Sequence, residues 1–260
     1  MTWLAFGGGG ARGFAHIGAY ARLLEIPGFE LTGASGASAG AIKAAVIAAG
    51  HHPAELLDFA VRLKPSEFMV FNWQFLWRPG LFKIRLQDVL EPWVPSTLGD
   101  YEIPLVVTAT GSQSGEHLIY STELTPGLPT IPCVQASARF PLVFVDEKVK
   151  GVRTWDGGLW NNFPVEEGSG DVIGIRLDGE RPAIVPWRWY FGGLKNIIAL
   201  LMDAIEREHI EDAAFSKIIT LKTPVSPLDF HKLDADMIKR LYEIGYETVE
   251  KKLASGWSWR

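Results

Sequence analysis

The stretch GGGGARGFAHIG, residues 7–18, follows a short apolar run and leads into a segment with apolar residues at helical spacing. Glycine is favoured where the backbone turns sharply, or where its N–H groups must approach an anion with no side chain in the way. A glycine loop between a strand and a helix indicates an α/β fold. The anion that such a loop holds is either a bound phosphate or an oxyanion that forms during a reaction.

Strand and helix patterns alternate along the rest of the chain. We predict strands over residues 2–6, 29–33, 104–111, 117–121, 143–145, 152–155, 171–177 and 218–222. We predict helices over residues 12–24, 39–50, 53–63, 131–138, 194–214 and 235–253. This alternation is typical of a mostly parallel sheet covered on both faces. Because no linker or internal repeat interrupts it, we expect residues 1–260 to form a single domain.

The composition limits the classes of partner. The chain has 260 residues, 47% of them hydrophobic, which is enough to bury a large core. Its formal net charge of -5 and the lack of a basic run argue against a nucleic-acid partner. The lone Cys133 excludes an internal disulfide framework and fits a reducing compartment. No signal peptide pattern and no spanning apolar run are present, so we expect a cytoplasmic protein.

Ten tryptophans are the unusual feature of the composition. Several lie in two stretches, FMVFNWQFLWRPGLF at residues 68–82 and PWRWYFGG at residues 186–193. Such residues are either ordinary core aromatics or a rim that meets lipid, because tryptophan suits a surface with one apolar and one wet side. We predict that the rim, and with it a peripheral membrane contact, is formed around Trp73, Trp77, Trp187 and Trp189.

The glycine loop also matches a nucleotide-binding pattern. Residues 8–13 satisfy G-x-G-x-x-G between a strand and a helix, which is the dinucleotide signature. That signature is completed by an acidic residue about 20 positions on, at the end of the second strand. Glu30 has this spacing but begins the second strand, whose end carries Thr32 and Gly33. A Rossmann-type cofactor protein therefore stays an alternative.

A second motif indicates a nucleophile. Residues 36–40 read G-x-S-x-G between a predicted strand and a predicted helix. A serine at this position projects from a tight turn, and Gly36 and Gly40 relieve the crowding around Ser38. Ser35 is the rival nucleophile, but it lacks glycine at its second flanking position. Ser38 is the better candidate, against the alternative that it merely begins the helix.

A nucleophilic serine needs a general base. Among the six histidines, His231 is the best placed by sequence, and it reads as a solvated loop residue. Asp156 follows a predicted short strand, and Gly157 and Gly158 leave its carboxylate uncrowded. Aromatic neighbours of a carboxyl group can raise its proton affinity and make it a usable base. The histidines and the cysteine form no convincing metal-ligand cluster.

Together these stretches resemble the patatin-like phospholipase family. The family's glycine loop, G-x-S-x-G and D-G-[GA] motifs stand here at residues 8–13, 36–40 and 156–158, with family-like flanks at 136–141 and 161–165. The resemblance covers residues 3–66, 100–178 and 215–253, and it does not extend to residues 67–99 or 180–195.

The resemblance implies a three-layer α/β/α fold and a Ser-Asp dyad without histidine. It implies that Ser38 is the nucleophile and Asp156 the base, that Arg12 braces the loop, and that the oxyanion hole is formed by Gly8, Gly9 and Gly10. The implied activity is hydrolysis of lipid acyl esters through an acyl-serine, of phospholipase, lysophospholipase or carboxylesterase type, with no cofactor and no metal. The alternatives are the nucleotide-binding protein and a non-catalytic lipid-binding module on the same fold.

Overall fold

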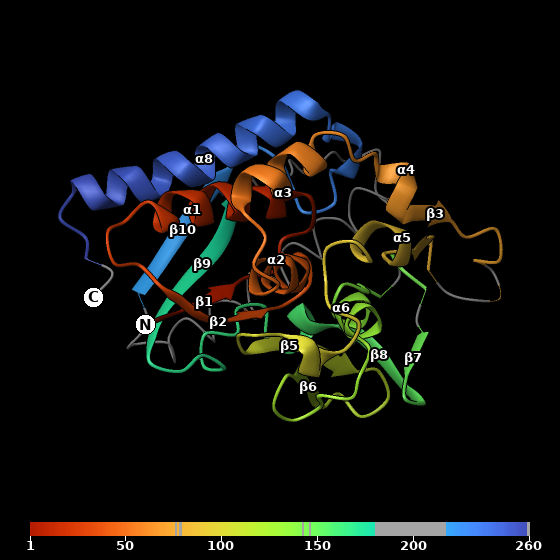
Figure 1. The fold of residues 1–260 in the computed structure, drawn as a ribbon. Helices are drawn as coiled ribbons and strands as arrows, with labels where there is room; N and C mark the ends of the chain where they lie inside the picture. Colours follow the sequence, from red (N-terminus) through yellow and green to blue (C-terminus); the bar gives the residue numbers. More distant parts are fainter. Residues whose placement is uncertain (76, 78–79, 142, 146, 180–216, 259–260) are drawn as a thin grey trace.

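The computed structural model describes residues 1–75, 77, 80–141, 143–145, 147–179 and 217–258 (Figure 1). Its main feature is an eight-stranded sheet with the order β10-β9-β1-β2-β5-β8-β7, and β6 pairs with β5. The strands are β1 Thr2–Phe6, β2 Leu31–Gly36, β5 Leu105–Gly111, β6 His117–Ser121, β7 Glu147–Val149, β8 Val152–Asp156, β9 Asp171–Gly179 and β10 Lys217–Thr223. A separate two-stranded sheet pairs β3 Met69–Phe71 with β4 Phe82–Ile84.

The five strands from β10 to β5 run parallel, and β6, β7 and β8 add antiparallel pairs. The register on β5 positions the two candidate catalytic residues. The last residue of β2, Gly36, pairs with Val107, and the last residue of β8, Asp156, pairs with Ala109. Because β2 and β8 end beside neighbouring parts of the same strand, the residues that follow β2 come close to Asp156.

Helices cover one face of the parallel strands (Figure 1). The α-helices are α1 Ala15–Leu24, α2 Ala39–Ala48, α3 Pro53–Ala60, α4 Pro65–Phe68, α5 Gln87–Leu90, α6 Thr130–Ser137 and α8 Ala235–Ala254, and short 3-10 turns are η1 Gly10–Phe14, η2 Leu98–Asp100, η3 Gly157–Leu159 and η5 Phe230–Lys232. Helix α1 packs closely on α8, because a Cβ on Gly18 would stand 1.8 Å from the carbonyl oxygen of Tyr242. This contact fixes the helix that directly follows the glycine loop.

Side chains of β1 alternate between the two faces of the sheet, as a strand requires. Leu4 and Phe6 join the main hydrophobic core on the helix side. Ala5 packs with Phe163 and Val165 in a separate cluster. The segment after η3 therefore covers the other face of β1, next to the glycine loop.

Most of the predicted elements are confirmed within a few residues, with four differences. Residues 143–145 form no strand: Phe144 makes an isolated bridge with Phe82, and the strand follows at Glu147–Val149. The second strand runs to Gly36, and the helix predicted from residue 12 begins as a 3-10 turn. Elements α4, β3, β4 and α5 carry no predicted counterpart. The predicted helix 194–214, with Trp187 and Trp189, lies outside the described residues.

Candidate active site

Ser38 stands on a sharp turn between β2 and α2. Its φ of 54° and ψ of -124° lie in a region that residues other than glycine rarely adopt. The flanking glycines make this turn possible: a Cβ on Gly36 would lie 2.4 Å from the Gly40 carbonyl oxygen. A Cβ on Gly40 would lie 2.1 Å from the carbonyl oxygen of Phe6. A side chain at position 36 would therefore collide with the start of α2, and one at position 40 would collide with the end of β1.

The two candidate serines have different surroundings. Ser35 is fully buried within β2, where its Oγ donates to the carbonyl oxygen of Pro164 at 2.8 Å and accepts from Trp3 Nε1 at 3.1 Å. Ser38 lines a pocket, and its backbone N–H donates to Ser137 Oγ at 2.9 Å. Ser35 is thus engaged in holding the strand, whereas the Ser38 hydroxyl faces the space where a substrate can enter.

The structure brings Ser38 and Asp156 together from positions 118 residues apart. The Ser38 Oγ donates to Asp156 Oδ2 at 2.7 Å. The second carboxylate oxygen of Asp156 accepts from the Gly158 N–H at 2.8 Å, which fixes the plane of the carboxylate. The backbone is held as well, because the Asp156 carbonyl oxygen accepts from Thr110 Oγ1 at 2.9 Å. Both ends of the residue are therefore fixed against β5 and η3.

Burial changes the acidity of Asp156, which is only 1% exposed. Removal from water raises the pKa of its carboxyl group to about 7, against the smaller lowering effects of the hydrogen bonds from Ser38 and Gly158. A carboxylate with this pKa binds a proton more readily than an ordinary one and is half ionised near neutral pH. It has the proton affinity of a general base at physiological pH.

The histidines do not take part in this contact. His231 lies exposed on η5, and in the described part of the chain it forms no hydrogen bond or ion pair with Ser38 or Asp156. His16 is buried near the glycine loop, with Nε2 2.9 Å from the Gly7 carbonyl oxygen. Burial lowers the pKa of His16 to about 3, so the ring stays neutral and acts as a fixed donor to the loop. Among the described residues, the titratable group that accepts the Ser38 hydroxyl hydrogen bond is the Asp156 carboxylate.

Arg12 fixes the peptide between Gly9 and Gly10 in the glycine loop. The Gly9 carbonyl oxygen accepts from the Arg12 backbone N–H at 3.1 Å and from Arg12 Nε at 3.4 Å. In a trans peptide the C=O and the next N–H point in opposite directions, so the Gly10 N–H is directed away from Arg12. Gly10 lines the same pocket as Ser38 and Asp156. Its φ of 54°, and a Cβ position 2.1 Å from the Pro227 carbonyl oxygen, require glycine.

Gly8 and Gly9 have different surroundings. The Gly8 N–H donates to the Asn162 carbonyl oxygen at 2.9 Å, and a Cβ on Gly8 would lie 3.1 Å from Ser38 Cβ. A Cβ on Gly9 would lie 2.6 Å from Leu177 Cδ1. A side chain at position 8 would therefore crowd Ser38, and the Gly8 N–H is already hydrogen-bonded to Asn162.

The side chain of Asn162 lies between the glycine loop and the aspartate turn. Its fully buried side chain would lie 2.2 Å from a Cβ on Gly8 and 2.5 Å from a Cβ on Gly158. Gly157 is confined in the same way, since a Cβ there would meet the Thr108 carbonyl oxygen at 2.3 Å. The sequence marks residues 161–165 as a family-like flank, but only the structure reveals that Asn162 separates the two loops.

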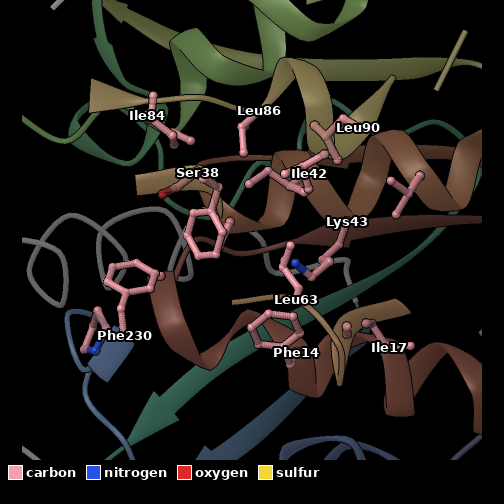
Figure 2. Close-up of a pocket in the computed structure, with 18 of the residues that line it drawn as sticks. Phe14, Ile17, Ser38, Ile42, Lys43, Leu63, Ile84, Leu86, Leu90 and Phe230 are labelled. Atoms are coloured by element: carbon pink, nitrogen blue, oxygen red, sulfur yellow. The ribbon is translucent and has the colours of Figure 1, made fainter. Parts of the chain in front are cut away.

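Ser38 and Asp156 line a pocket whose wall is mostly apolar, and Figure 2 shows Ser38 among these apolar side chains. The wall comes from α1, α2, α3, the β3–β4 region, α5 and the segment around η5. The apolar lining residues are Phe14, Ile17, Ala39, Ile42, Val46, Leu56, Phe59, Ala60, Leu63, Phe68, Ile84, Leu86, Val89, Leu90, Trp93, Ala138, Phe140, Phe144, Pro227, Leu228 and Phe230. Such a wall favours a hydrocarbon chain over a polar group.

No group of three or more His, Cys, Asp and Glu side chains among the described residues is placed to hold a metal ion. None of the helices described is long and apolar enough to cross a membrane.

A family model of patatin-like phospholipases matches residues 4–168. This range includes the glycine loop, the Ser38 turn and the Asp156 turn. The chain belongs to the patatin-like phospholipase family. The family predicted from the motifs is confirmed.

The relatives of this patatin-like protein extend over different lengths. It is 30% identical to the uncharacterised protein YqhO of Bacillus subtilis over 94% of this chain and 95% of that protein. It is 28% identical to an uncharacterised NTE family protein of Mycobacterium tuberculosis, over 67% of this chain and 46% of that longer protein. In fold it is similar to VipD from Legionella pneumophila, with a TM-score of 0.63 and 18% identity over 98% of this chain and 66% of that one. This likeness and the mixed, mostly parallel sheet with flanking helices confirm the three-layer α/β/α prediction.

The patatin-like site leaves little support for nucleotide binding. Glu30 is exposed and lies just before β2. The dinucleotide signature requires an acidic residue at the other end of this strand. The end of β2 carries the Ser38 turn in place of an acidic residue. The residue that would bind a ribose is therefore missing from the place where the dinucleotide fold needs it.

Proposed function

We propose that this patatin-like protein is a serine lipid acyl hydrolase that works through a Ser38–Asp156 dyad and an acyl-serine intermediate. The observation that carries the proposal is the 2.7 Å hydrogen bond from Ser38 Oγ to Asp156 Oδ2 at the opening of an apolar pocket. A strained serine turn, a buried carboxylate with raised pKa and an adjacent glycine loop are the parts that acyl transfer requires.

Acylation begins when Asp156 Oδ2 takes the proton of Ser38 Oγ as the oxygen attacks the ester carbonyl carbon. The carbonyl oxygen becomes an oxyanion, which the Gly10 N–H stabilises together with the N–H of Ala39 at the start of α2. Both residues line the pocket. Gly8 and Gly9 shape this oxyanion hole, and Arg12 holds the Gly9 carbonyl oxygen away from it. The ester bond then breaks, and the alcohol leaves with the proton from Asp156.

Deacylation repeats these steps with water. Asp156 takes a proton from a water molecule as the water oxygen attacks the acyl-serine carbonyl. The tetrahedral intermediate collapses, the fatty acid leaves, and the proton returns to Ser38 Oγ. Each residue thus returns to its starting state. The apolar pocket holds the acyl chain during both steps, so the carbonyl carbon stays beside the nucleophile.

We propose further that the protein meets lipid surfaces through an aromatic hairpin, defined here as β3, β4 and the described residues between them. At its tip Trp73 is 86% exposed and Trp77 is 88% exposed. Phe71 packs edge-on against Trp73, with ring centroids 4.9 Å apart. The side chain of Asn72 donates to the Gly80 carbonyl oxygen at 2.8 Å and holds the tip together.

The same hairpin reaches the pocket at its base. Phe68, just before β3, and Ile84, at the end of β4, line the pocket wall. Tryptophan is favoured at membrane interfaces, where its ring is partly in apolar surroundings. Contact of the tip with a membrane would therefore bring the pocket wall near the lipids from which an acyl chain is drawn.

The dyad is tested with a matched pair of serine variants. Ser38→Ala removes the nucleophile, whereas Ser35→Ala removes a hydroxyl from the neighbouring strand. We expect Ser38→Ala to abolish hydrolysis of p-nitrophenyl esters and labelling by a serine-reactive phosphonate, and Ser35→Ala to retain most of both. Hydrolysis by folded Ser38→Ala would refute the dyad. An unlabelled Ser38 in the unsubstituted protein would favour a non-catalytic lipid-binding module.

A further inference from the structure

Lys43 is a charged side chain buried on the wall of the pocket. It lies on α2, five residues after Ser38, which corresponds to about 7.5 Å along the helix axis. Its exposure is 9%, and it lines the same pocket as Ser38 and Asp156. Figure 2 shows its side chain extending from α2 toward Phe14. The ammonium nitrogen lies 4.7 Å from the centroid of the Phe14 ring.

No carboxylate of the described residues forms a salt bridge with this ammonium group. His16 on α1, which is neutral, lies close enough to Lys43 and to Arg12 on η1 for both positive charges to lower its pKa. Asp156 lines the same pocket, but its carboxylate responds to Ser38 and Gly158, not to Lys43. The rest of the described lining is apolar apart from Gly10 and Ser38.

A buried ammonium group without a counter-charge is unfavourable. Burial lowers the pKa of Lys43 to about 8, so the protonated form still exceeds the neutral form by roughly ten to one at pH 7. A methionine has a similar length and would fill the same space without this cost. Among the described residues the ammonium group contacts the face of the Phe14 ring but no carboxylate, so an anionic group of a bound ligand would supply the counter-charge.

We propose that Lys43 is a specificity-determining residue that binds an anionic oxygen group, phosphate or carboxylate, of the lipid ester. This inference rests on the proposed function and narrows it. Lys43 lies on α2 about one and a half helical turns from Ser38. The anionic group of the bound ester must therefore lie within the length of a lysine side chain from that position. The preferred substrates are therefore acyl esters that carry a negative charge a short distance from the ester bond, ahead of uncharged esters of equal length.

The test compares matched anionic and uncharged esters on the full chain. One pair is a p-nitrophenyl half-ester of a dicarboxylic acid and the p-nitrophenyl ester of the monocarboxylic acid of equal length. The other pair is lysophosphatidic acid and monoacylglycerol with the same acyl chain. The measured quantity is the ratio of kcat/KM for the anionic ester to kcat/KM for the uncharged one. The pair with the larger ratio identifies carboxylate or phosphate as the group bound.

Three variants make the comparison specific. We expect Lys43→Met to lower this ratio by about 10- to 100-fold, the range for loss of one charged hydrogen bond. Lys43→Arg keeps the charge and should keep part of the preference. Lys239→Met removes the same charge from an exposed position on α8 and should leave the ratio unchanged. If Lys43→Met does not fold, the unsubstituted protein gives the same test, because its ratio should fall as the pH rises through about 8.

An equal ratio in Lys43→Met and in the unsubstituted protein, or a ratio that ignores pH, would overturn the inference while leaving the dyad intact. Failure to hydrolyse any of the esters, with no phosphonate labelling of Ser38, would instead overturn the proposed function together with it.

Discussion

The raised pKa of Asp156 predicts how the activity depends on pH. Only the ionised carboxylate can accept the Ser38 proton, and its pKa is about 7 in place of 3.8. Below pH 7 we expect kcat/KM to fall about tenfold for each pH unit, and therefore about 100-fold by pH 5. A carboxyl group with an ordinary pKa would stay ionised over this range, and the rate would remain constant.

The same shift predicts a pH-dependent cost to stability. Because the folded-state pKa exceeds the unfolded value, the folded protein holds the Asp156 proton more tightly, and stability falls as the pH rises from about 4 to about 7. Asn at this position carries no charge at any pH. Between pH 5 and pH 8 the stability of Asp156→Asn relative to the unsubstituted protein should therefore rise, by up to about 3 kcal/mol for roughly two pKa units.

Two measurements test this reasoning. The first is kcat/KM from pH 5 to pH 8 with an uncharged short-chain ester, so that Lys43 has no anionic group to bind. The second is urea denaturation of Asp156→Asn and the unsubstituted protein at both ends of that range. A rate that does not change between pH 5 and pH 8 would refute the assignment of Asp156 as a base with raised pKa. So would strong activity in Asp156→Asn, or crippled activity in His231→Ala.

Three further predictions concern the loop, the hairpin and the pocket. Gly10→Ala should lower kcat by about 10² or more, because the turn at Gly10 carries an oxyanion donor. The control is Gly50→Ala, which also has a positive φ but lies in open space and should leave kcat unchanged. Equal losses of kcat in the two variants would contradict the prediction. Replacing Trp73 and Trp77 by Ser should weaken hydrolysis of vesicle lipid but not of a soluble ester, with the exposed Leu124→Ser as control, and equal losses on both substrates would refute the membrane contact. Lys43→Met should raise the free energy of unfolding at pH 7 by up to about 3 kcal/mol. This gain should shrink between pH 8 and pH 10.5 in matched denaturation curves, because the pKa of Lys43 is lower in the folded than in the unfolded protein.

The parts of the site that could be predicted are those that short sequence patterns determine. A serine between two glycines at a strand-to-helix turn has few other backbone solutions, and the clashes at Gly36 and Gly40 explain why. The aspartate was predictable as a residue after a strand with glycines behind it. The pairing of the two needed the resemblance to a family, because 118 residues separate them and only the register on β5 brings them together.

The region between residues 65 and 100 could not be predicted from local patterns. Strands β3 and β4 are three residues each and are joined by a long loop, so no periodicity identifies them. Their pairing depends on tertiary contacts, such as the Phe82 N–H that donates to the Val143 carbonyl oxygen. Residues 143–145 are apolar, and this is why the sequence predicts a strand there, but in the structure they contribute only an isolated bridge between Phe144 and Phe82.

Lys43 shows most clearly where sequence reasoning stops. A lone lysine among small apolar residues in AGAIKAAVIAAG normally indicates the solvated face of a helix. Here no face of α2 is solvated, because one side packs on β1, β2 and β5 and the other forms the pocket wall. The family motifs, which we propose cleave the ester, are local in sequence. The pocket wall comes from segments scattered over the chain, so the charge that we propose selects the ester becomes visible only once the pocket is built.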